Sequence, residues 1–120
     1  MTVTTAEDIG ILTAAILFEE PPLRNQVVYT AGDTITYGRL AETVTAVTGR
    51  EIRKTVWTVD DLREALAQDP MNSLRKYRLV FAEGIGVAWN AQMSYNATRN
   101  IPVKDVEHWL ESATKSGKDQ

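Results

Sequence analysis

Residues 3–18, VTTAEDIGILTAAILF, carry the clearest local signal in the chain, that of an N-terminal helix. Thr5 is a good N-cap, and Asp8 three residues later makes a variant of the capping box. Residues 1–4 are expected to form a short strand, and Pro21–Pro22 to end the helix, because proline cannot continue the hydrogen-bond ladder. Apolar side chains at helical spacing predict a stripe facing the core: Ile9, Leu12 and Ile16, with Ala15 and Phe18 beside them.

Downstream of this helix, residues 26–31 (QVVYTA) and 52–58 (IRKTVWT) are predicted to be short strands. Between them, Thr36 is expected to cap a helix over residues 37–48, with Gly49 at the position where a glycine commonly ends a helix. Because a two-stranded sheet is marginal alone, these strands need helix cover or a third strand.

Three more helices are predicted in the second half of the chain. Thr58 and Asp61 repeat the capping-box pattern, Asn72 or Ser73 caps the next helix, and Pro102 opens the last one. The middle helix carries the apolar residues Leu74, Tyr77, Phe81 and Ile85, and the last carries Val103, Val106, Trp109, Leu110 and Ala113.

These elements predict an α/β, α+β-like and helix-rich fold. Residues 1–114 form a single domain, with a small sheet of two to three short strands covered by about five helices. Residues 115–120 are expected to be a frayed polar tail.

Composition excludes several functional classes. With 120 residues, 43% of them hydrophobic, the chain is one ordinary domain, and its net charge of −3 argues against a nucleic-acid binder. The lack of cysteine and the single histidine leave no metal site. No signal peptide precedes the first helix and no apolar run approaches the roughly 20 residues that span a bilayer, so we expect a cytoplasmic protein.

No catalytic or cofactor-binding motif is recognised in these residues. Gly84 and Gly86 do not follow a predicted strand, and Trp89 stands where a third glycine of a dinucleotide loop would be. Their expected role is structural, such as close helix packing. His108 is expected to be an exposed residue of the last helix, without the partners that acid–base chemistry needs.

Aromatic and sulfur-containing residues gather in the middle and later chain: Trp57, Tyr77, Phe81, Trp89, Met93 and Tyr95. Two interpretations are open for this group. It can be plain core packing, or it can line an apolar pocket for a flat ligand, with glycines making space beside it.

The ordered motifs of the chain resemble a known family. The segment 3–10 (VTTAEDIG), the segment 33–40 (DTITYGRL), the strand-like 52–56 (IRKTV) and the closing 103–110 (VKDVEHWL) are together similar to isoflavone-reductase-like and NmrA-like proteins. These are atypical short-chain dehydrogenases. The resemblance covers about residues 1–114 and falls on the family's C-terminal, substrate-binding lobe.

The resemblance implies a function as well as a lobe. The family's Rossmann lobe, with its glycine-rich turn, its NAD(P) site and the catalytic lysine of the reductases, has no counterpart in this chain. The chain would bind a small apolar or aromatic substrate, without catalysis or cofactor binding of its own. It would dock on a Rossmann lobe or on a second copy as a homodimer, with no nucleic-acid or membrane partner. A match of low specificity to the family's pocket helix suggests which residues line the substrate pocket: Tyr77, Phe81, Gly84 and Trp89. Glu83 is either a polar contact of the substrate or a solvated helix residue.

Two alternatives remain beside this interpretation. The chain can be part of an NmrA-like regulatory protein that senses redox state through a dinucleotide, or a stand-alone dimeric interaction domain.

Overall fold

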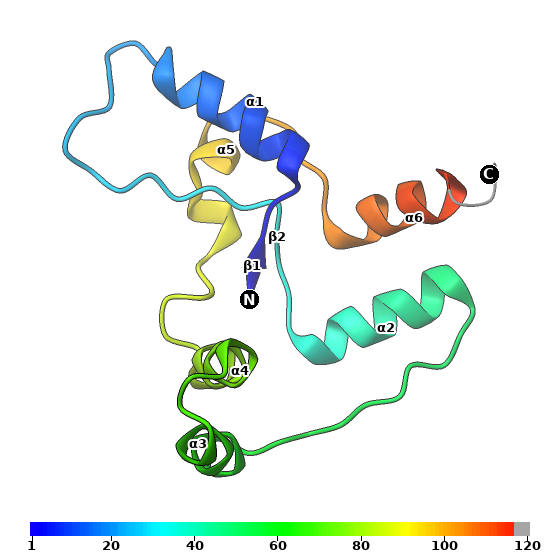
Figure 1. Cartoon of the computed structure of the whole chain (residues 1–120). Helices are drawn as coiled ribbons and strands as arrows, with labels where there is room; N and C mark the ends of the chain where they lie inside the picture. Colours follow the sequence, from blue (N-terminus) through cyan, green and yellow to red (C-terminus); the bar gives the residue numbers. More distant parts are fainter. Residues whose placement is uncertain (117–120) are drawn as a thin grey trace.

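The computed structural model describes residues 1–116 and is helix-rich with one small sheet (Figure 1), which confirms the predicted fold class. In chain order the elements are β1 (Thr2–Val3), α1 (Ala6–Leu17), β2 (Asp33–Thr34), α2 (Tyr37–Thr48), α3 (Val59–Gln68), α4 (Ser73–Glu83), the 3-10 helix η1 (Ala91–Met93), α5 (Tyr95–Thr98) and α6 (Val106–Ser116).

The sheet joins the N-terminus to the segment before α2. β1 and β2 are antiparallel, with Thr2 opposite Thr34 and Val3 opposite Asp33. On its other side, the Thr2 N–H donates to the Val87 carbonyl at 2.8 Å, and the Trp89 N–H donates to the Thr2 hydroxyl at 3.0 Å. The short strand expected in residues 1–4 is therefore present, and it ties three distant segments together.

The two longer strands expected from the sequence are wrong. Residues 26–31 form no ladder, because their backbone bonds instead to α5: the Tyr95 N–H donates to the Tyr29 carbonyl at 2.7 Å, and the Asn96 amide bridges the N–H and carbonyl of Ala31. Residues 52–58 run between α2 and α3 without a partner strand (Figure 1). An extended segment becomes a strand only when another backbone lies beside it.

Four predicted helix starts are confirmed. Thr5, Thr36 and Asn72 accept the expected backbone N–H bonds, and Thr58 and Asp61 make a complete capping box. At the other end of α2, Gly49 adopts the left-handed conformation with φ of 67°, as its position predicts.

Other helix boundaries differ from the prediction. α1 ends at Leu17, before the two prolines, and α4 ends at Glu83, so Ile85 lies outside it. α6 begins at Val106 rather than at Pro102, because Asp105 accepts the His108 N–H at 2.8 Å and so caps the helix. Helix α6 includes Lys115 and Ser116, and the rest of the expected tail lies outside the described residues.

The helices pack in pairs, α3 with α4 and α2 with α6, around a small core. The buried apolar residues are Leu12, Ala31, Ile35, Leu62 and Tyr95. The radius of gyration is 17.4 Å, whereas a compact chain of this length has about 14 Å. None of the described helices combines the length and apolar character needed to cross a membrane.

Candidate functional site

Three of the four residues predicted to line a pocket lie on or next to helix α4. Tyr77 and Phe81 are one turn apart and project from the same face as Leu74, and Gly84 is the C-cap. We call the surface formed by Leu74, Tyr77 and Phe81 of α4 the hairpin surface. Tyr77 is 65% exposed and Phe81 36%, so these rings are not core residues.

Helices α3 and α4 pack against each other as a hairpin, and polar contacts also link them. Arg63 pairs with Glu83 at 2.9 Å, and an Nη of Arg75 donates to the Ala65 carbonyl at 2.5 Å. Arg78 lies over the Trp57 ring, 4.6 Å from its centroid. Glu83 is therefore a link between the two helices, a role that neither sequence interpretation of this residue included.

Gly84 serves the helix end rather than close packing. Its φ is 71°, and a Cβ placed there would meet no atom within 4 Å, so the expected packing role is wrong. Carbonyl groups, not N–H groups, project from a helix C-terminus, so Gly84 and Gly86 do not fit a dinucleotide diphosphate.

Trp89, the fourth predicted lining residue, contacts residues 29–30 rather than helix α4. Its indole N–H donates to the Thr30 carbonyl at 2.9 Å, and its ring lies 5.4 Å from that of Tyr29. Within residues 1–116, no ring pairing joins Trp89 to Tyr77 or Phe81.

A second concave feature lies between the N-terminus, α2 and α6. This N-terminal groove has a volume of about 430 Å³ and mainly apolar walls that include Val3, Ala6, Leu40, Val106 and Trp109. The volume is within the usual range of small-molecule sites. Sequence patterns did not predict this groove, because its walls come from three separated segments.

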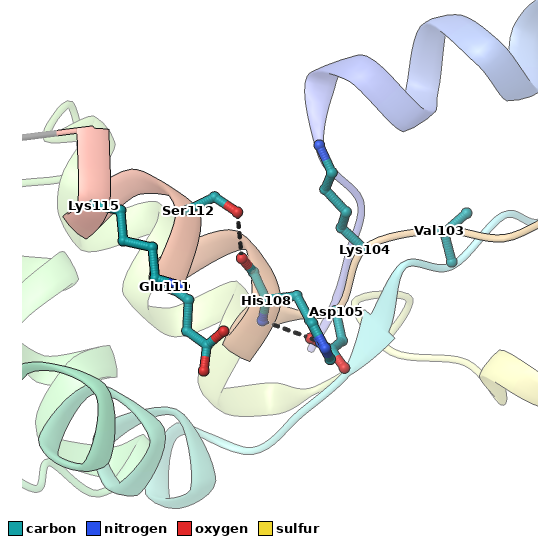
Figure 2. Close-up of a pocket in the computed structure, with 7 residues that line it drawn as sticks. All are labelled: Val103, Lys104, Asp105, His108, Glu111, Ser112 and Lys115. Carbon is teal, nitrogen blue, oxygen red and sulfur yellow. Dashed lines mark hydrogen bonds and ion pairs between the residues drawn. The ribbon is translucent and has the colours of Figure 1, made fainter.

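The third feature is a depression of about 370 Å³ beside α6 (Figure 2). Most of its side chains are charged, and several of them have partners within the chain. Asp105 pairs with His108 at 2.7 Å, and Figure 2 shows Lys104 reaching away toward α1, where it bonds Glu7 at 2.5 Å. The Asp105 carboxylate raises the pKa of His108, and the His108 N–H lowers that of Asp105.

This depression is the solvent-exposed first turns of helix α6 and the segment before it. The His108 side chain is 73% exposed, which confirms the expectation of an exposed residue. In residues 1–116 no group of three His, Asp or Glu side chains is arranged to hold a metal ion. The pair is therefore explained by capping, without a reacting group.

Glu19, Tyr95 and Arg99 form another titratable cluster, at the end of α1. The Tyr95 hydroxyl bonds Glu19, and the Arg99 Nε donates to the same carboxylate at 2.8 Å, which together lower the pKa of Glu19. Glu19 in turn raises the pKa of Tyr95. A phenol held neutral by a carboxylate is a structural donor, and this cluster fastens α1 to α5.

Comparison with known proteins finds one informative relative. No family profile and no solved structure matches the chain. An "NmrA-like family domain-containing oxidoreductase" of Gibberella moniliformis is 34% identical over 111 residues, which is 92% of this chain and 36% of the relative. The chain thus spans about a third of that relative's length and is related to part of an NmrA-like oxidoreductase.

Proposed function

We propose that the chain is the substrate-binding part of an NAD(P)-dependent oxidoreductase of the NmrA-like, isoflavone-reductase-like kind. The observation that carries this proposal is the 34% identity, spread over 92% of the chain, to a protein named as an NmrA-like oxidoreductase. The open shape supports it, because a lobe that works against another lobe leaves one side uncovered.

The hairpin surface is the part that meets the substrate. Tyr77 and Phe81 present two rings on one rigid helix, and the αL turn at Gly84 keeps the end of that helix free of side chain. Aromatic faces of this kind bind flat, apolar molecules through buried area and ring stacking. The substrate class is therefore a small apolar or aromatic compound.

NAD(P) belongs to the rest of such a protein. The glycines of the described residues lie inside helices, end helices or lie in loops, and they do not form a strand–turn–helix phosphate site. The cofactor supplies the hydride, and the residues of this chain bind and orient the molecule that receives it. Alone, the chain catalyses nothing.

Calorimetric titration tests both parts of the proposal on the 120-residue chain. We expect no heat with NADPH and measurable binding of naphthol, an aromatic probe. Phe81→Ala should weaken naphthol binding about fivefold or more, the ~1 kcal/mol typical of an energetically important aromatic contact. Lys76→Ala, an exposed position of the same helix, should leave it unchanged.

Trp109→Ala separates this site from the N-terminal groove. If Trp109→Ala weakens naphthol binding and Phe81→Ala does not, the substrate lies in the groove and the hairpin assignment is wrong. Micromolar binding of NADPH would contradict the proposed division of roles, because a dinucleotide site would then exist in this chain.

A further inference from the structure

Arg78 lies beside the hairpin surface and is held there by a ring from another segment. It follows Leu74 by four residues and precedes Phe81 by three, so its side chain is a neighbour of both on helix α4. Its guanidinium carbon lies 4.6 Å from the centroid of the Trp57 ring, which belongs to the segment before α3. The hairpin surface therefore has a positioned cation at its edge.

The charge of Arg78 has no counterpart in the part of the chain that the structure describes. The arginines of this part that pair with carboxylates are Arg39, Arg63 and Arg99. The partner of Arg78 among the same residues is the Trp57 ring, which offers no acceptor oxygen. A guanidinium presents five N–H donors in a planar fork, so these donors are open to an anion from outside.

Positive charge also predominates in the two segments that meet at this cation–π contact. Arg75 and Lys76 lie on helix α4, whose one acidic residue, Glu83, is already paired with α3. Arg53 and Lys54 come shortly before the tryptophan, and neither forms an ion pair with the described residues. The whole chain has a net charge of −3, so this is a local excess of positive charge, which attracts anions.

We infer that the substrate of the hairpin surface is an aromatic carboxylate, and that Arg78 selects it through its carboxylate group. The rings of Tyr77 and Phe81 contact the flat part of the molecule. The planar fork of Arg78 matches both oxygens of one carboxylate, and one guanidinium balances its single charge. This inference rests on the proposed function, because it names the class of the substrate that the same surface binds.

Trp57 acts as a positioning residue in this arrangement. An exposed ion pair loses much of its strength to the entropy of holding a long side chain in one geometry. Contact with the Trp57 ring restricts Arg78 before the ligand arrives, so less of that cost falls on binding. Trp57→Leu should therefore weaken the binding of a carboxylate, although the charge of Arg78 is kept.

Calorimetric titration of the 120-residue chain with naphthoate and with naphthol tests the inference. At about pH 7 the first probe is charged and the second is neutral, because carboxyl groups titrate at about 4 and phenols at about 10. We expect naphthoate to bind about fivefold more tightly, the upper range for an exposed ion pair. Arg78→Gln should reduce this ratio of affinities to about one, and Trp57→Leu should lower it. Lys76→Gln removes the same charge from the opposite side of helix α4 and should keep the ratio.

The outcomes separate this inference from the proposed function. If naphthol binds and Phe81→Ala weakens its binding, but naphthoate binds no more tightly than naphthol, the inference is overturned and the proposed function stands. Equal loss of the preference in Arg78→Gln and Lys76→Gln would also overturn it, because the attraction would then come from net charge alone. If neither compound binds, both the proposed function and the inference are wrong. Far-UV circular dichroism checks that the variants fold.

Discussion

Asp8 joins two segments that are almost a hundred residues apart. Its side chain is buried, and one carboxylate oxygen accepts the Thr5 hydroxyl at 2.8 Å and the Lys104 N–H at 2.9 Å. The acidic residue in the VTTAEDIG segment is thus explained by packing: it fastens the start of α1 to the approach of α6.

Asp8→Ala should destabilise the chain by about 1–3 kcal/mol, because the Lys104 N–H loses its acceptor in a partly buried place. Urea unfolding followed by circular dichroism measures the change. The neighbouring Glu7→Ala removes an exposed ion pair and should cost less than about 1 kcal/mol. Equal costs for the two variants would mean that Asp8 has no such linking role.

His108 titrates at a pKa raised above 6.5 because Asp105 bonds and attracts the protonated ring, with smaller attraction from Glu111 and Glu107. The folded pKa is the higher one, so the pair stabilises the fold below about pH 6.5. The contribution is lost as the pH rises through the folded-state pKa.

Asp105→Asn keeps a capping oxygen but removes the charge, so the pKa of His108 should fall toward 6.5. Since His108 is the only histidine, its ring protons can be followed by NMR without assignment ambiguity. An unchanged titration curve would show that Asp105 does not face the ring in solution.

At the scale of elements, replacing a glycine by alanine should lower the stability of the chain at one helix position and raise it at another. Gly84→Ala forces a left-handed conformation on a side chain at the end of α4 and should cost about 1 kcal/mol. Gly38→Ala, in the first turn of α2, replaces a right-handed helical glycine that has space around it and should stabilise by up to ~1 kcal/mol. Urea midpoints measure both, and a stabilising Gly84→Ala would be inconsistent with the αL cap.

Helix caps were predictable because each depends on residues three positions apart. Thr58 and Asp61 meet wherever the rest of the chain goes, and the pairing of Tyr77 with Phe81 on one face has the same local origin. Strands depend on distant partners, and residues 29–31 find α5 rather than another strand. Trp89 failed to join the hairpin surface for the same reason, since Thr30 and Tyr29 hold it elsewhere.

The buried face of α1 shows a second limit of sequence patterns. Helical spacing predicted a stripe through Ile9, Leu12 and Ile16, but Ile9 is 51% exposed while Asp8 is buried. In a helix that is apolar on all sides, spacing alone does not say which side meets the core. The polar partners of Asp8 and Glu19 decide the orientation, and they come from residues 95–104.

For the molecule as a whole, the open shape sets how it should unfold. The unfolded chain would expose about 19,400 Å², and a compact monomer of the same mass would bury about two-thirds of that area. With 9127 Å² still accessible, this chain buries only about half. Because the urea dependence of unfolding scales with the area exposed, an isolated monomer should show a shallow transition.

Urea unfolding of the 120-residue chain, followed by circular dichroism, measures this slope. A steep transition, with the slope of a compact domain of this size, would mean that the single chain closes on itself in solution.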